Sequence, residues 1–376
     1  MSNRDFVRSL PHYAPLSAPA RLRQIHLDPL LLVTLLGVIA LGLLVLYSAV
    51  DRNVTMFTNQ ATRMCAAVVA MLVAAQIHPR FYLRWTPVFY GGGLIMLVLV
   101  LLVGDIANGS QRWLDLPGLP RFQPSEIMKL AVPMMVARYL HERPLPPSLK
   151  DVFAALVIIG VPIGLIAEQP DLGTAILIAA AGLAVVVLAG LPWKWIGLAG
   201  VGFAAAAPGL WFLLHDYQRR RILTLFDPTS DPLGAGWNTI QSTTAIGSGG
   251  VYGKGLFEGT QSHLDFLPES HTDFIVAVIG EELGLIGILT VLALYLVLLM
   301  RGLYIATQAA HTFERLTAGA LILTFFVYAF VNIGMVCGLL PVVGVPLPLI
   351  SYGGTSAITL LVSFGIIMSV RTHRGW

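Results

Sequence analysis

The sequence predicts an all-α polytopic membrane protein with about ten transmembrane helices. Hydrophobic residues make up 56% of the 376 residues and charged residues only 11%, against about 25% in soluble chains. Apolar runs of about 20 residues, the length that crosses a bilayer, recur along the chain. They leave one water-exposed segment of any size, so we expect a single membrane domain over 1–376.

The apolar runs place the spans in chain order. We expect them at 29–50, 57–78, 85–104, 124–141, 151–168, 171–190, 193–214, 272–300, 314–338 and 348–370. An even number puts both termini on one side, and Lys and Arg are enriched in that side's loops, so the termini are predicted to be cytoplasmic. The segment 1–28 is then cytoplasmic, while 105–123 and a large loop, 215–271, lie outside.

The fourth span is weakly apolar and carries charges. Pro124 and Ser125 start a helix, and Glu126 and Lys129 share one of its faces because they are three residues apart. Charged side chains at this depth must face protein or a wet cavity, which places the span inside the bundle. The pair is either a structural ion pair or a functional cation with its partner.

Two outer segments flank this span. Arg112 and Trp113 precede it, and each has an alternative interpretation as an interfacial anchor of the aromatic-belt type. Asp171 follows Pro170 in a tight turn between the fifth and sixth spans, where it is either a helix N-cap or a site residue at the depth of Arg112.

The large outer loop contains three features. A basic cluster at 219–221 is typical of an interfacial patch for anionic headgroups, and 237–246 could form a re-entrant or surface helix. The glycine run 247–255 fails the phosphate-loop template, because Ser248 and Gly255 stand where glycine and Ser or Thr are required. We interpret the run as a flexible loop, with backbone donation to a phosphate as the alternative.

The stretch LPESHTDF, residues 267–274, places an acid where this loop becomes a hydrophobic helix. Asp273 is either a helix cap or an interfacial functional acid. Deeper in the same span, Glu281 and Glu282 are functional candidates by default, because ionisable groups inside a membrane are costly. Farther on, prolines in 341–348 forbid regular helix, and broken backbone at membrane depth must be buried or line a cavity. We expect the segment 339–356, which contains these prolines, to wall the site.

Long motifs in the sequence resemble the SEDS family (shape, elongation, division and sporulation), and nearly the whole chain takes part. The motifs include QRWLDL at 111–116, RFQPSEI at 121–127, QPDLGT at 169–174, LPESHTDF at 267–274 and GLLPVVGVPLPLISYGGTS at 338–356. The resemblance implies a glycosyltransferase that polymerises lipid II into peptidoglycan glycan strands during cell elongation. It also implies a bacterial inner-membrane location, with the active site facing the periplasm.

The resemblance further implies the site residues and partners. The family's catalytic aspartate falls on Asp273, and the substrate-binding candidates are Arg112, Trp113, Lys129, Glu126, Gln123, Asp171, Lys254, Thr272 and Ser351. The expected partners are lipid II, the growing glycan on its polyprenyl pyrophosphate, a class B penicillin-binding protein and other elongation-complex membrane proteins. No basic run with interleaved aromatics predicts nucleic-acid binding. No motif demonstrates a metal site, although a divalent cation, Mg²⁺ or Mn²⁺, could assist.

We therefore expect Asp273 to act as general base on an acceptor hydroxyl, with Arg112 and Lys129 stabilising the pyrophosphate that leaves. Two alternative functions stay open, and the first would use the same buried polar residues. A lipid II flippase or transporter would make Glu126, Lys129, Glu281 and Glu282 an alternating-access pathway. A non-catalytic scaffold for the penicillin-binding protein would reduce Asp273 to a helix cap.

Overall fold

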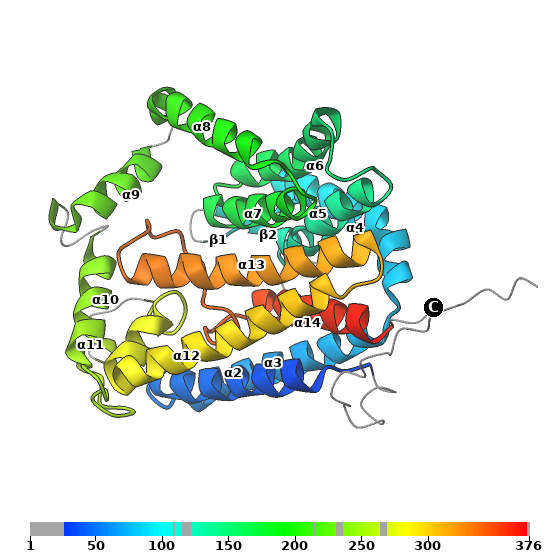
Figure 1. The fold of residues 1–376 in the computed structure, drawn as a ribbon. Helices are drawn as coiled ribbons and strands as arrows, with labels where there is room; N and C mark the ends of the chain where they lie inside the picture. The colour runs from blue at the N-terminus through cyan, green and yellow to red at the C-terminus, as the bar shows by residue number, and fades with distance from the viewer. Residues whose placement is uncertain are drawn as a thin grey trace, which may run out of the picture.

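The computed structural model describes residues 26–107, 110–114, 122–213, 216–230, 236–263 and 269–373. Across them, each predicted span coincides with one helix (Figure 1). These helices are α2 (Pro29–Ala49), α3 (Val54–Gln76), α4 (Pro79–Val103), α5 (Pro124–His141), α6 (Leu149–Ala167), α7 (Leu172–Leu188), α8 (Trp193–Leu213), α12 (Ile275–Thr307), α13 (Thr312–Val336) and α14 (Thr355–Thr372). The all-α prediction is confirmed. Most of the predicted segment 1–28 lies outside the described residues.

Seven of these helices are long and apolar enough to cross a membrane, namely α2, α3, α4, α6, α12, α13 and α14. The helix α5 carries Glu126, Lys129 and Arg138, and α7 is shorter, with 17 residues. The number of spans and the side on which the termini lie therefore stay predictions. The last helix begins at Thr355, later than the predicted 348, because the proline-containing backbone remains irregular through Gly354.

Local sequence explains where several helices begin. Side-chain oxygens of Asp28, Asn53 and Asp171 each accept a backbone N–H from the first turn of α2, α3 and α7, which satisfies a donor that has no partner within the helix. Ser148 and Asp151 form a reciprocal capping box at the start of α6. Proline occupies the first turn of α2, α4 and α5, where its missing N–H costs nothing.

The segments predicted to lie outside contain further short elements. A two-stranded antiparallel hairpin pairs β1 (Asp105–Ala107) with β2 (Ser110–Trp113) between α4 and α5. The large loop holds α9 (Asp216–Phe226), a 3₁₀ turn (Pro228–Ser230), α10 (Trp237–Ser248) and α11 (Thr260–His263). The helix predicted at 237–246 is confirmed as α10, which packs on α12.

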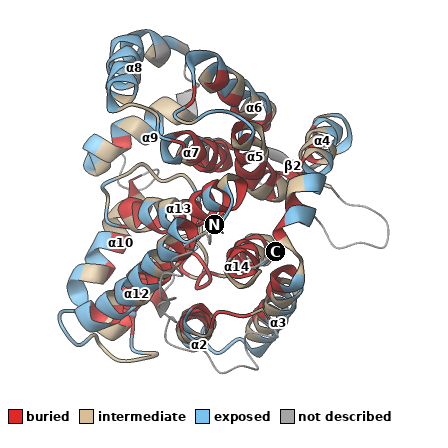
Figure 2. Cartoon of the chain, turned by 45° about the vertical axis from the view of Figure 1, so that its right-hand side comes forward, coloured by how far each residue is buried: buried red, intermediate tan, exposed pale blue. Residues whose placement is uncertain are grey.

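The buried core lies where α5, α7, α13 and α14 meet (Figure 2). Most residues of α5 are buried despite their charges, which confirms that this helix is interior. By contrast, α8 lies at the periphery, with most of its described side chains exposed (Figures 1 and 2). The non-helical segment 337–354 runs between α13 and α14. It supplies part of the lining of a small polar cavity.

Candidate active site

A small polar cavity of about 140 Å³ lies beside the buried ends of α5 and α7. Its lining includes five predicted substrate-binding residues, Arg112, Gln123, Glu126, Lys129 and Asp171, together with Thr174, Tyr328, Gly344, Thr355 and Ser356. Three larger hollows, of about 870, 470 and 210 Å³, expose mainly apolar surface. They lie between α4 and α6, between α12 and α13, and beside Pro79, His141 and Phe313. The polar cavity is therefore the better candidate for chemistry, although it is smaller.

The buried cation in this cavity is Lys129. Its Nζ lies 2.6 Å from Glu126 Oε1 and 5.1 Å from the centroid of the Tyr328 ring. The predicted ion pair between Glu126 and Lys129 is thus confirmed, and Tyr328 adds a cation–π contact from α13. Glu126 Oε2 is buried without a hydrogen-bond donor among the described residues. The cavity consequently holds a paired charge with spare hydrogen-bonding capacity.

The hairpin places Arg112 in the lining of the same cavity. Its Nη2 donates to the carbonyl oxygen of Pro170 at 2.8 Å, and its Nη1 lies 3.6 Å from Asp171 Oδ1. Asp171 also caps α7 by accepting from Thr174 N at 3.2 Å, and it accepts from Gln123 Nε2 at 3.1 Å. The N-cap interpretation of Asp171 is therefore confirmed, and the same carboxylate also orients Arg112.

Asp273 lies just before α12 and does not cap it. The N-cap position belongs to Phe274 and has no side-chain cap hydrogen bond, so the capping interpretation of Asp273 is wrong. A Cβ built on Gly344 would stand 3.4 Å from Asp273 Oδ2, and Gly344 lines the polar cavity. The carboxylate therefore lies beside the cavity wall, free of a helix-capping role.

Asn332 holds this arrangement together, and it was missed in the sequence analysis. Its Nδ2 donates to the backbone oxygen of Asp273 at 2.8 Å and to that of Val345 at 2.7 Å. One fully buried amide in α13 thus ties the start of α12 to the segment 337–354. A lone asparagine inside an apolar span was the signal that could have found it, because buried polar groups require partners.

The pKa of Asp273 is raised to about 6, mainly because burial disfavours the charged carboxylate. The neighbouring charge of Glu269 raises this pKa further, whereas Arg221 lowers it. The carboxylate is therefore mostly ionised at neutral pH yet close to its titration point. A general base is most effective when its pKa is near the working pH.

The other predicted site residues do not line the cavity. Thr272 Oγ1 donates to Glu269 Oε2 at 2.7 Å, next to Asp273, and Trp113 ends β2 in a half-buried position. Ser351 is buried, where its Oγ accepts from Leu347 N at 2.8 Å and closes a turn of the 337–354 segment. Their functional roles stay predictions.

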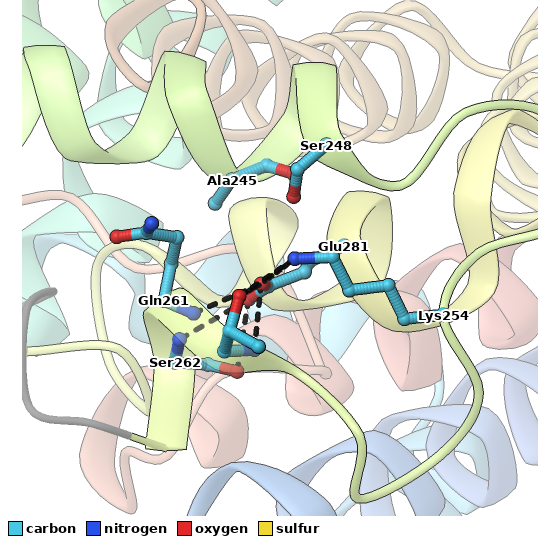
Figure 3. A network of polar contacts seen from close by, with 7 residues as sticks. Ala245, Ser248, Lys254, Gln261, Ser262 and Glu281 are labelled. Atoms are coloured by element: carbon cyan, nitrogen blue, oxygen red, sulfur yellow. Dashed lines mark hydrogen bonds and ion pairs between the residues drawn. The ribbon is translucent and has the colours of Figure 1, made fainter.

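Lys254 belongs to a different cluster, built around Glu281 (Figure 3). The Glu281 carboxylate is fully buried and accepts from Lys254 Nζ at 2.7 Å. It also accepts the backbone N–H groups of Thr260, Gln261 and Ser262 at 2.8, 2.9 and 3.1 Å. Glu282 bonds elsewhere, accepting from the Ser48 hydroxyl of α2 at 2.7 Å. Ser48 Oγ in turn accepts from Phe257 N at 3.0 Å, so Glu281 holds the loop directly and Glu282 holds it through Ser48.

The glycine run is docked, so its interpretation as a flexible loop is wrong. The helix α12 is interrupted at Gly284, which has φ 64° and ψ −160°, and the loop fills the interruption. Lys254 N and Gly255 N donate to the oxygens of Glu281 and Glu282 at 2.9 and 3.0 Å. Leu285 N and Ile286 N donate in turn to the oxygens of Gly250 and Val251 at 3.0 and 3.2 Å.

A divalent cation has no evident ligand set in this cavity. Within the described ranges, no group of three or more His, Cys, Asp or Glu side chains is placed to hold a metal ion. Glu126 is paired with Lys129, and Asp171 already meets Arg112 and Gln123. The negative charges of both carboxylates are thus neutralised by Lys129 and Arg112, which leaves neither one available as an unpaired metal ligand.

The fold and site define a polytopic membrane protein with a cationic cavity beside an acid at a helix start. Residues 25–375 match the profile of the FtsW/RodA/SpoVE family, described as cell cycle proteins. The chain is 56% identical over 352 residues to the peptidoglycan glycosyltransferase MrdB of Escherichia coli K12, covering 93% of this chain and 95% of that protein. It therefore belongs to the FtsW/RodA/SpoVE family, and the SEDS resemblance is confirmed.

More distant relatives agree. The chain is 39% identical over 311 residues to the probable peptidoglycan glycosyltransferase FtsW of Geobacter sp. M18, covering 81% and 83% of the two chains. The crystal structure of the Thermus thermophilus rod shape determining protein RodA matches with TM-score 0.71 and 28% identity, covering 93% and 98%. A chain from a peptidoglycan synthase complex, described as coordinating polymerization and crosslinking, matches with TM-score 0.81 and 30% identity, covering 93% and 99%.

Proposed function

We propose that this chain is a peptidoglycan glycosyltransferase that polymerises lipid II into glycan strands during cell elongation. The identity to MrdB over almost the full length supports the reaction class. The observation that carries the mechanism is the position of Asp273, whose carboxylate lies beside Gly344, a residue that lines the same cavity as Arg112 and Lys129. The proposed base, Asp273, therefore lies beside the cavity that Arg112 and Lys129 line.

In this mechanism Asp273 removes the proton from a sugar hydroxyl of the acceptor lipid II. The hydroxyl oxygen then attacks the anomeric carbon of the growing chain, and the bond from that carbon to the pyrophosphate oxygen breaks. The proton stays on Asp273, and the bonding electrons leave with the polyprenyl pyrophosphate. General base catalysis of this kind contributes about 10²–10⁴ in rate.

The leaving group develops negative charge, which Arg112 and Lys129 are placed to stabilise. Arg112 retains a buried Nε with no hydrogen-bond partner among the described residues, and Lys129 Nζ lines the cavity. Fixed cations in a site shielded from water stabilise such charge far better than they would in bulk solvent. Asp171 acts as a positioning residue, because it holds the Arg112 guanidinium.

We infer that the protein lies in the bacterial cytoplasmic membrane, with this site facing the periplasm, and that it works with a class B penicillin-binding protein and other elongation-complex membrane proteins. Seven helices of spanning length and apolarity support the multi-pass location. The similarity to a chain of a complex described as coordinating polymerization and crosslinking supports the transpeptidase partner.

The test is polymerisation of labelled lipid II by the full-length protein in detergent together with its penicillin-binding protein. The wild type should make glycan polymer, Asp273→Ala should abolish it, and the outer-loop control Asp227→Ala should not. Polymer made by Asp273→Ala would remove this residue from the role of base. Lipid translocation without polymer would instead favour a flippase, and normal cell shape with Asp273→Ala would favour a scaffold.

A further inference from the structure

The outer part of α3 carries polar side chains on an exposed face. Thr55, Thr58, Asn59, Thr62 and Arg63 are all exposed, and their spacing of three and four residues puts them on one side of the helix. We call this set the α3 polar face. Over an 18-residue stretch, α3 has a mean hydropathy of 1.2, the lowest among the seven candidate spans. Lipid tails cannot solvate such a face, so it requires water or a polar ligand.

Arg63 is the deepest member of the α3 polar face. It lies nine residues after Val54, where α3 begins, which corresponds to roughly 13 Å along the helix. Among the described residues it forms no ion pair with a carboxylate. An arginine at that depth without an acidic partner is costly in a membrane and marks a functional site by default.

The Arg63 side chain rests on the turn that precedes α14. Its guanidinium carbon lies 5.4 Å from the centroid of the Tyr352 ring, and a Cβ on Gly354 would stand only 2.8 Å from Arg63 Cδ. One turn earlier, Gln60 binds the same segment, with Nε2 donating to Ser351 O at 3.2 Å and Oε1 accepting from Gly353 N at 3.3 Å. The position of Arg63 is therefore fixed by packing against this turn.

The turn that Arg63 contacts leads directly into the lining of the polar cavity. Thr355 and Ser356, which directly follow Gly354, line the cavity that contains Arg112 and Lys129. Tyr352 N donates to His271 O at 2.8 Å, and the two rings lie 5.9 Å apart. His271 is two residues from Asp273. The segment 344–356 is thus contacted by Arg63, supplies part of the lining of the cavity that contains Arg112 and Lys129, and lies beside the Asp273 carboxylate.

We propose that Arg63 and the α3 polar face bind the pyrophosphate of the acceptor, a second lipid-linked sugar substrate. The inference rests on the proposed function, in which both substrates carry a polyprenyl pyrophosphate and only the donor loses it at Arg112 and Lys129. The second pyrophosphate needs its own cation on the other side of the base. A guanidinium suits this task, because its planar donors bind phosphate oxygens in pairs.

The test separates the two substrates by extending a preformed glycan on polyprenyl pyrophosphate with labelled lipid II. Arg63→Gln should raise the KM for lipid II by about tenfold or more and leave the KM for the glycan donor unchanged. Arg63→Lys should fall between, because it keeps the charge and loses the paired donors. The matched control is Arg52→Gln, an exposed outer arginine packed over Phe257 at 4.6 Å, and it should change neither KM.

A binding measurement keeps this result distinct from the proposed function. Lipid II binding to Asp273→Asn protein should be saturable and should weaken when Arg63→Gln is added, whether or not the wild type polymerises. If folded Arg63→Gln protein shows neither a higher KM for lipid II nor weaker lipid II binding, the acceptor site is overturned. A rise in the KM for the glycan donor alone would overturn it as well. Phosphatidylglycerol added to the micelles distinguishes the source of phosphate: an Arg63→Gln effect seen only with that lipid would assign the site to membrane headgroups and overturn the proposal.

Discussion

The Glu281 carboxylate, fully buried in α12, accepts a hydrogen bond from the Lys254 ammonium at 2.7 Å. It also accepts hydrogen bonds from three backbone N–H groups of the segment 260–262 (Figure 3). Hydrogen bonds to a charged acceptor each contribute roughly 1.5–3 kcal/mol. Glu281→Gln should therefore loosen residues 249–263 markedly. Hydrogen exchange should rise across this segment, whereas the exposed control Glu258→Gln should leave it unchanged. Equal protection in both variants would show that Glu281 does not anchor the loop.

Gly253 tests the docking of the glycine run independently. Its φ is +80°, and a Cβ there would stand 2.1 Å from Glu282 O, so Gly253→Ala must displace the loop from α12. We expect a loss of at least about 1–3 kcal/mol, the usual cost of overpacking, measured as a lower melting temperature. Gly247→Ala is the control, since nothing lies within 4 Å of the added atom. Equal melting temperatures for the two variants would contradict the docked arrangement.

The pH dependence of polymerisation should report the titration of Asp273. Its pKa of about 6 means that the rate falls as the pH drops through that value, because the base becomes protonated. Glu269→Gln removes a charge that raises this pKa, so the acid limb should move to lower pH. Arg221→Gln removes a charge that lowers it and should move the limb to higher pH. Limbs that stay in place in both variants would mean that another group limits the rate.

The buried pair Glu126 and Lys129 allows structural and chemical roles to be separated. Lys129→Met leaves a carboxylate buried without its cation, which should cost roughly 3–5 kcal/mol. The double variant Glu126→Gln with Lys129→Met should recover most of that stability, because no isolated charge remains. It should still fail to polymerise lipid II if Lys129 stabilises the leaving group. A double variant as active as the wild type would leave the pair with a structural role only.

Much of the scaffold followed from periodicity, apolar run length and helix-start chemistry. Each predicted span coincides with a helix, and the ion pair at Glu126 and Lys129 followed from their spacing on one helical face. The segment 339–356, predicted to wall the site, supplies part of the cavity lining at 344–346 and 355–356. These features depend on residues close together in the sequence.

The features that were missed depend on contacts between distant segments. The strands β1 and β2 are too short and polar to show a strand pattern, yet they position Arg112. The sequence predicts a flexible loop at the glycine run, because the partner of the run, the interruption of α12 at Gly284, lies about 30 residues later in the chain. Lys254 was grouped with the site, although its carboxylate partner is Glu281. Asn332 escaped notice because its two acceptors are backbone oxygens of remote residues.

The interruption of α12 at Gly284 has a consequence for how relatives of this protein can be recombined. Continuous helix would pair Leu285 N with Glu281 O and Ile286 N with Glu282 O; here all four groups bond to the loop 250–255 instead. The loop 250–255 and the helix α12 therefore depend on each other for their backbone hydrogen bonds, and we expect them to be exchangeable only together. A chimera that exchanges the loop alone leaves bonding groups of a membrane helix without counterparts, whereas a chimera that moves both segments together preserves them.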